Sequence, residues 1–208
     1  MTGTDLRVRT SRTVTEKDLR RLSAAFGPAY AEGLWCADAE SRRDSVCAAL
    51  LLLSMLRARG IPPRRVARNP EGKPFFLGAD GNRVPDCHFS LSHDRGVVCC
   101  ALSGREIGAD LMLLPPPLPP GRQEKMAARF LPPSDAGLPF DAAWTRMEAY
   151  SKLRGGRLAD VFRCTYPENA EFETLTRRIS GGRRVTVTLC RFRTRDGALQ
   201  KDWKGDSV

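Results

Sequence analysis

The stretch Cys87-His88-Phe89-Ser90-Leu91-Ser92-His93-Asp94-Arg95-Gly96-Val97-Val98-Cys99-Cys100-Ala101-Leu102 predicts a central hairpin. Its first seven residues alternate between apolar and polar side chains, which is typical of a strand with one buried face. Asp94-Arg95-Gly96 is typical of a hairpin connection, and the apolar run after it predicts a buried returning strand. Ser92 and His93 therefore lie at the end of a strand beside a tight turn, where a hydroxyl and an imidazole can bind a phosphate. The alternative is that His93 is an ordinary surface residue.

The segment that follows the hairpin predicts a strand with an acid on it. In Ile107–Met112, Asp110 shares a face with Gly108 and Met112, while the alternating apolar residues share the core face. An acid in an otherwise apolar strand needs a partner or a cation. Gly108 beside it leaves room for a bulky ligand to approach the backbone.

A helix further along the chain carries an acid and a base on one side. Trp144, Glu148 and Lys152 recur at every fourth position, so they lie one above the other on a helix. Asp141 is expected to cap this helix, and Gly155-Gly156 to end it. Glu148 lies at the edge of the buried stripe, where a carboxylate can bind a metal or accept a proton. The alternative is an exposed Glu–Lys pair that contributes about 0.3–0.5 kcal/mol and no chemistry.

The strongest helix of the first half is predicted at Ser41–Arg59, with apolar residues on its buried side. Its first turn carries Arg42, Arg43 and Ser45. Cations at the start of a helix oppose its macrodipole, so these arginines would be better placed if they bound an anion. Two solvated arginines are the alternative.

The remaining segments complete two similar halves. Leu6–Thr10 predicts a strand, and Thr15, with a carboxylate three residues later, opens a helix that runs to Phe26. A stiff Pro-rich loop is expected at 115–120, a short helix at 122–130 and a strand at 183–192. Both halves thus contain a strand, a helix and further strands. We expect an α+β fold with two α+β halves of about 100 residues, 1–105 and 106–208.

Composition narrows the class of protein. The net charge of +10 and the pI of about 9.7 predict an anionic partner, for which nucleic acid, a phosphorylated cofactor and an acidic protein all qualify. The seven cysteines have no Cys-x-x-Cys spacing, which favours free or buried thiols over a disulfide framework or a zinc site. No apolar run is long enough to span a membrane, and Met1–Arg12 carries no apolar signal core. We therefore expect a cytoplasmic protein without a membrane partner.

Four segments in this order carry a resemblance to a known family: Gly72-Lys73-Pro74, Phe89–His93, Ile107–Asp110 and Trp144–Lys152. Each motif alone is weak, but their order and spacing together are specific. From about Ser41 to Gly156, the chain resembles the 4′-phosphopantetheinyl transferases of the long, surfactin-type subclass. The resemblance implies a single-chain pseudo-dimer, a monomer, with its active site in the cleft between the two halves.

The implied reaction transfers the 4′-phosphopantetheine arm of coenzyme A to a serine of an apo acyl or peptidyl carrier protein and releases 3′,5′-ADP. Asp110 and Glu148 resemble the family's ligands to Mg²⁺, with Mn²⁺ as a substitute. The resemblance also implies contacts with coenzyme A. Lys152 would bind the pyrophosphate, and Lys73, Ser92 and His93 would bind phosphates of coenzyme A. Arg42 or Arg43, together with Ser45, would bind the 3′-phosphate. Glu148, or a water that it orients, is the candidate base for the incoming serine.

One position departs from the family. The subclass has a third metal ligand two residues after the strand aspartate, and Met112 stands there in this chain. Either a water takes that ligand's place, or activity is weakened or lost.

Two other functions compete with the transferase. The first is a transferase-like protein that binds coenzyme A or a carrier protein without turnover. The second is a basic nucleic-acid-binding protein, which is disfavoured because the few aromatic residues do not interleave with the Lys and Arg runs as a stacking platform requires.

Overall fold

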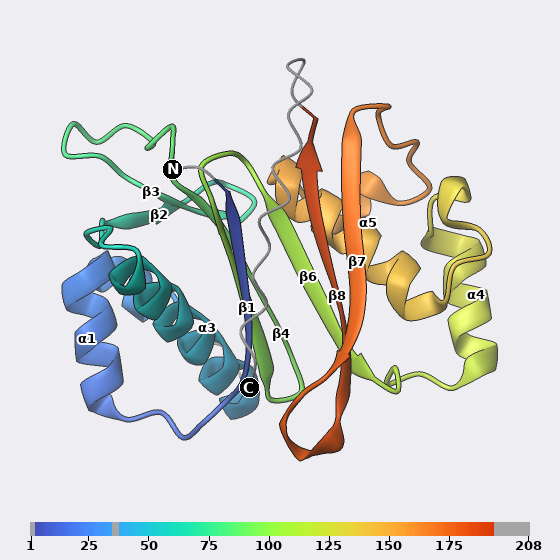
Figure 1. The fold of residues 1–208 in the computed structure, drawn as a ribbon, viewed down its shortest axis with the longest axis horizontal. Helices are drawn as coiled ribbons and strands as arrows, with labels where there is room; N and C mark the ends of the chain where they lie inside the picture. Colours follow the sequence, from blue (N-terminus) through green and yellow to red (C-terminus); the bar gives the residue numbers. More distant parts are fainter. Residues whose placement is uncertain (1–2, 35–37, 194–208) are drawn as a thin grey trace.

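The computed structural model describes residues 3–34 and 38–193, and their fold is α+β, as predicted (Figure 1). The elements are β1 (Thr4–Thr10), α1 (Glu16–Phe26), α2 (Pro28–Glu32), α3 (Ala39–Ala58), β2 (Val66–Arg68), β3 (Pro74–Phe76), β4 (His88–Asp94), β5 (Val97–Ser103), β6 (Gly108–Leu114), α4 (Pro120–Phe130), η1 (Pro133–Asp135), α5 (Phe140–Arg154), η2 (Leu158–Val161), β7 (Ala170–Arg178), η3 (Ser180–Gly182) and β8 (Arg184–Phe192). Of the seven cysteines, Cys36 lies outside the described ranges. The other six are free thiols.

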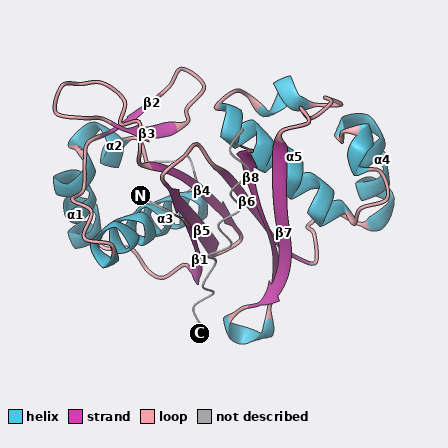
Figure 2. Cartoon of the chain, turned by 45° about the horizontal axis from the view of Figure 1, so that its top comes forward, coloured by secondary structure: helices cyan, strands magenta, loops and turns pink. Residues whose placement is uncertain are grey.

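Two antiparallel three-stranded sheets form the centre of the molecule, with helices on their outer sides (Figure 2). The helix α3 packs on one face of the first sheet, α1 packs against α3 and α2 against α1, and α5 packs on one face of the second sheet. The other faces share an apolar core, to which Cys99 and Ala101 contribute from the first sheet and Leu111 and Val187 from the second. The two halves are thus held together by buried apolar surface.

Both halves follow the same topology. Each begins with a strand, continues through helices and ends with two strands, and in each three-stranded sheet the last of these strands lies in the middle. The orders are β1-β5-β4 and β6-β8-β7. The two sheets therefore repeat one strand order. The first half also contains the separate two-stranded sheet β2-β3. The boundary between residues 105 and 106 stays a prediction.

Local sequence signals explain the elements around the site. Thr15 and Asp18 form the predicted capping box at the start of α1. The predicted hairpin is present, and its turn holds Arg95 and Gly96 at positive φ. The Asp44 carboxylate of α3 accepts a hydrogen bond of 2.8 Å from the Gly96 N–H. This contact joins the first turns of α3 to the end of β4.

Several expectations about the second half were wrong in detail. Pro139, not Asp141, is the N-cap residue of α5, because the helix already begins at Phe140. Asp141 lies in its first turn, and its carboxylate accepts a hydrogen bond from the Thr186 hydroxyl. Pro120 is the first residue of α4, a position where its missing N–H costs nothing. The strand β7 was not predicted. As expected, α5 ends at Gly155, and this glycine has the left-handed conformation.

The space beside Gly108 is filled by the protein itself. A Cβ atom there would lie 1.9 Å from the Ala149 carbonyl oxygen and 2.5 Å from the Leu153 nitrogen. The expectation of room for a ligand was therefore wrong, because the backbone of α5 packs directly on β6 at this point. This close approach brings the acid-bearing face of α5 onto Asp110.

None of the helices in the described ranges combines the length and the apolar composition that a membrane crossing requires.

Candidate functional site

Side chains of β4 hold the edge of β6 and so position Asp110. The Ser90 hydroxyl accepts a hydrogen bond of 2.9 Å from the Ala109 N–H, and the Asp94 carboxylate accepts one of 2.8 Å from the Leu113 N–H. These contacts satisfy backbone donors that point away from β8. Asp110 therefore lies on a strand that is fixed on both sides.

Asp110, Ser92 and Lys152 form a compact triangle at the junction of β6, β4 and α5. The Ser92 hydroxyl donates to Asp110 Oδ1 over 2.6 Å. The Lys152 ammonium donates to the same oxygen over 2.6 Å and to the Ser92 Oγ over 2.8 Å. The Asp110 side chain is 4% exposed and that of Lys152 is 31% exposed. The buried carboxylate thus has the cationic partner that it needs, and this cation can still reach solvent.

Glu148 lies one turn before Lys152 and interacts with the same carboxylate. The Trp144 indole N–H donates to Glu148 Oε1 over 2.7 Å, so the predicted stacking of these side chains along α5 is present. Burial and the nearby charge of Asp110 raise the pKa of Glu148 to about 7, although Lys152 and the Trp144 hydrogen bond act in the opposite direction. Burial by itself would lower the pKa of Lys152, but Asp110 and Glu148 outweigh it and raise that pKa.

Ser45 and His93 meet at the start of α3. Their Oγ and Nε2 atoms are 3.2 Å apart, although the two residues are 48 positions apart in the chain. Burial lowers the pKa of His93, an effect that Asp44 opposes and Lys152 reinforces. The imidazole is therefore neutral at pH 7, and the nearby positive charge of Lys152 favours this neutral form.

The proposed 3′-phosphate residues lie in the same part of α3. Arg43 donates to Asp44 over 2.9 Å and to Glu40 over 3.1 Å. Arg42 is half-buried. The choice between Arg42 and Arg43 as the 3′-phosphate contact stays open.

Lys73 binds the end of α5. Its ammonium donates to the Leu153 carbonyl over 2.9 Å and to Glu106 over 3.0 Å. The neighbouring Asn69 side chain donates to the Gly155 carbonyl over 2.6 Å. In this structure Lys73 therefore satisfies one of the last carbonyls of the helix that carries Glu148 and Lys152, as a cation at a helix C-terminus does. Burial lowers the pKa of Lys73, against the effect of Glu106.

Asp110 and Glu148 are the residues that fit a divalent cation. Their two carboxylates are close together and largely buried. Burial and the repulsion between the two charges raise the pKa of Glu148. A hard divalent cation would relieve both effects. Over residues 3–34 and 38–193, no three His, Cys, Asp or Glu side chains form a metal-binding group. A metal held here would take its remaining ligands from substrate phosphate and water.

Three carboxylates that organise the site were missed by the sequence analysis. Asp44 binds the hairpin turn, Asp94 binds β6, and Glu106 binds Lys73. Each partner lies at least 19 positions away, so no local periodicity reveals the pair. The sequence offered one signal for these carboxylates, namely that each acid stands within a few positions of a predicted site residue or strand.

The pKa of Glu148 predicts how stability depends on pH. Because the folded-state pKa of about 7 lies above the ordinary value of 4.5, Glu148 stabilises the fold fully below pH 4.5. This contribution falls as pH rises from 4.5 and is lost above about 7. In EDTA, the unfolding free energy of the wild type minus that of Glu148→Gln should therefore decrease across this window. Denaturant unfolding at several pH values measures the difference, and a constant difference would contradict the raised pKa.

Neither the protein-family models nor the curated proteins that were compared with the chain gave a match.

Proposed function

We propose that this protein transfers the 4′-phosphopantetheine arm of coenzyme A to a serine of an apo carrier protein. The observation that carries the proposal is the meeting of Asp110, Glu148 and Lys152 beside Ser92. These residues come from three of the four segments that resemble the long 4′-phosphopantetheinyl transferases. The proposal also includes that the protein has the fold of this family and that it acts in the cytoplasm.

Asp110 and Glu148 would hold Mg²⁺, which would neutralise charge on the pyrophosphate of coenzyme A. In the reaction, the serine oxygen of the carrier forms a bond to the β-phosphorus, and the bond from that phosphorus to the bridging oxygen breaks. The products are the phosphodiester of the carrier and 3′,5′-ADP. The proton of the serine goes to Glu148, directly or through one water that Glu148 orients.

Lys152, Ser92 and His93 supply donors for the phosphates. The Lys152 side chain is long and partly exposed, so its ammonium can turn from Asp110 towards an incoming phosphate oxygen. Ser45 orients His93 through their hydrogen bond. The high positive charge of the whole chain favours an acidic carrier protein as partner.

The direct test is to incubate the protein with coenzyme A, Mg²⁺ and several apo acyl and peptidyl carrier proteins. Intact-mass analysis should show one carrier gaining the mass of one phosphopantetheine, and EDTA should stop the gain. If no carrier gains mass at any Mg²⁺ or Mn²⁺ concentration, the transferase proposal fails.

Met112 supports a second candidate, a protein that binds coenzyme A or a carrier without turnover. This residue is 8% exposed and lies on the same face of β6 as Asp110, where a third carboxylate would add to the metal site. A thioether is a soft ligand and does not coordinate Mg²⁺.

The variant Met112→Glu separates the two candidates. If a water takes the place of the third ligand, the variant should need less Mg²⁺ for half-maximal rate, and its maximal rate should stay within about tenfold of wild type. Titration of Mg²⁺ against rate, together with a thermal melt, measures both effects. A lower melting temperature with an unchanged Mg²⁺ curve would instead indicate that the place is closed to a metal and that the new charge is buried.

A further inference from the structure

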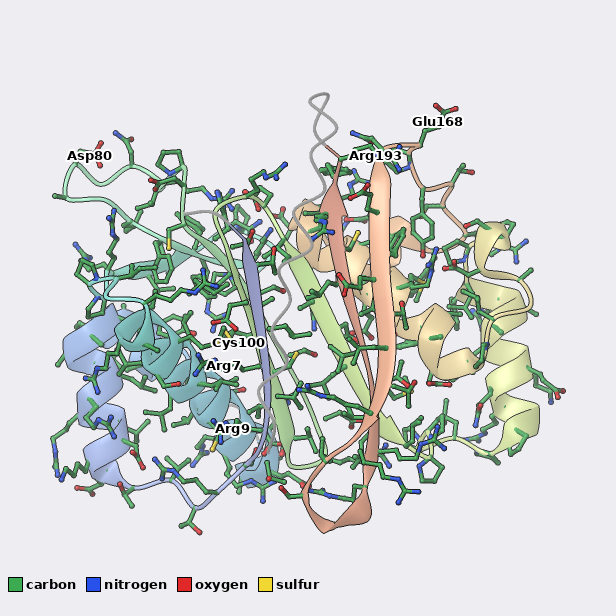
Figure 3. All side chains as sticks on the ribbon, viewed as in Figure 1. Arg7, Arg9, Asp80, Cys100, Glu168 and Arg193 are labelled. Atoms are coloured by element: carbon green, nitrogen blue, oxygen red, sulfur yellow. The ribbon has the colours of Figure 1, made fainter. Side chains whose placement is uncertain are left out.

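A basic hollow lies on the first half of the molecule, between β1, α1 and α3. We name it the arginine hollow. Its volume is about 440 Å³, within the range of ligand sites. It is lined by Arg9, Thr10, Arg12, Arg21, Cys47, Leu50, Leu51, Ser54, Arg57 and Val98. Figure 3 labels Arg9 on the strand β1, which lies beside α3.

Four arginines line the hollow, and among the described residues Asp18 is the only carboxylate paired with any of them. Asp18 accepts two hydrogen bonds from Arg12, of 2.9 and 2.8 Å, and lies 3.7 Å from Arg21. Asp18 thereby holds these two guanidinium groups in place. Within the described ranges, Arg9 and Arg57 form no salt bridge with any carboxylate, and both are exposed. The hollow therefore keeps a net positive charge.

The floor of the hollow is apolar. Cys47, Leu51 and Val98 are 8%, 6% and 1% exposed, and Leu50 is half-buried. On α3 the lining residues Cys47, Leu50, Leu51 and Ser54 follow the spacing of one helix face. That face meets the end of β1, where Arg9 pairs with Val98.

The arginine hollow is separate from the Asp110 site. Cys47 follows Ser45 by two residues, so the two side chains point to nearly opposite sides of α3. His93 contacts Ser45 on one side, and the hollow contains Cys47 on the other. None of the residues proposed for coenzyme A or metal binding lines the hollow.

We propose that the arginine hollow binds an acidic segment of a partner protein, with an aliphatic side chain on the apolar floor and carboxylates against the arginines. A compact phosphate would leave the floor uncovered, whereas a peptide with alternating acidic and aliphatic side chains matches both features. Arg9 and Arg57 supply the charges for the partner's carboxylates. This inference does not depend on transferase activity.

The test measures binding by titration calorimetry in the absence of coenzyme A. The probes are a short peptide that alternates glutamate with leucine, the same peptide with glutamine for glutamate, and the same peptide with alanine for leucine. Only the first should bind well, and added salt should weaken it. Inorganic pyrophosphate serves as the compact phosphate. If pyrophosphate binds in the hollow and the acidic peptide does not, the peptide proposal is overturned.

Matched variants locate the site. Arg9→Gln with Arg57→Gln should weaken the acidic peptide by about tenfold, which is the scale of two exposed charge pairs. Arg20→Gln with Arg184→Gln removes the same charge from exposed positions outside the hollow and should leave binding unchanged. Ser54→Asp places a negative charge at an exposed lining position and should weaken binding without loss of fold. Equal weakening by both double variants would mean that the peptide responds only to overall charge, which would overturn the proposal.

Discussion

Replacing Glu148 with glutamine should lower phosphopantetheine transfer by about a thousandfold, the combined scale of a lost base and a weakened metal site. The amide keeps the shape of the side chain and an oxygen that accepts the Trp144 hydrogen bond. It cannot accept the serine proton, and it is a poor ligand for Mg²⁺. Coenzyme A should still bind through its 3′-phosphate. Transfer rate at saturating Mg²⁺, with coenzyme A binding measured separately, tests both expectations.

The matched control is Glu71→Gln, which makes the same chemical change at an exposed position. It should transfer at the wild-type rate. Wild-type activity in Glu148→Gln would mean that the buried Glu148 carboxylate neither holds a catalytic metal nor accepts the serine proton. Loss of both transfer and coenzyme A binding, with a lowered melting temperature, would point to a damaged fold.

Replacing Gly108 with alanine should destabilise the protein by about 3 kcal/mol, at the upper end of overpacking effects. The added Cβ would meet the Ala149 carbonyl oxygen at 1.9 Å, and that oxygen belongs to a helix backbone which cannot rotate away. The helix α5 must therefore move from β6. For a chain of this size, the melting temperature should fall by roughly 10 °C.

Gly121→Ala is the control for this prediction. Gly121 lies in the first turn of α4, with no atom within 4 Å of an added Cβ. Alanine there should change stability by no more than about 1 kcal/mol and favour the helix. Equal melting temperatures for the two variants would show that α5 does not pack on β6 as described.

Much of the fold could be predicted because its signals are local. The capping box of Thr15 and Asp18, the Asp94–Gly96 turn and the αL glycine after α5 each depend on residues within a few positions. Alternation and helical spacing also placed Asp110 on a strand and Glu148 with Lys152 on one helix side. The resemblance to a family then suggested that these elements meet. The structure brings Asp110, Glu148 and Lys152 together.

The contacts that join distant segments could not be read from such signals. The contact of Lys73 with the end of α5, 80 positions away, had no local signal, and its predicted contact with a coenzyme A phosphate stays a prediction. Gly108 was predicted to leave space for a ligand, and α5 fills that space. The sequence shows that a lysine or a glycine is present. It does not show whether a ligand or another part of the chain lies next to that residue.

The sequence by itself determined the four longer helices, the hairpin and the chemical types at the site, since propensity, periodicity and caps act over one or two turns. Only the tertiary structure decided which surfaces are covered. The arginine hollow exists because β1 and α1 meet α3 while leaving the Cys47–Ser54 face open. Asp110 has a buried environment because α5 packs on β6. Burial and long-range pairing depend on how whole elements pack, and a local pattern contains no information about that packing.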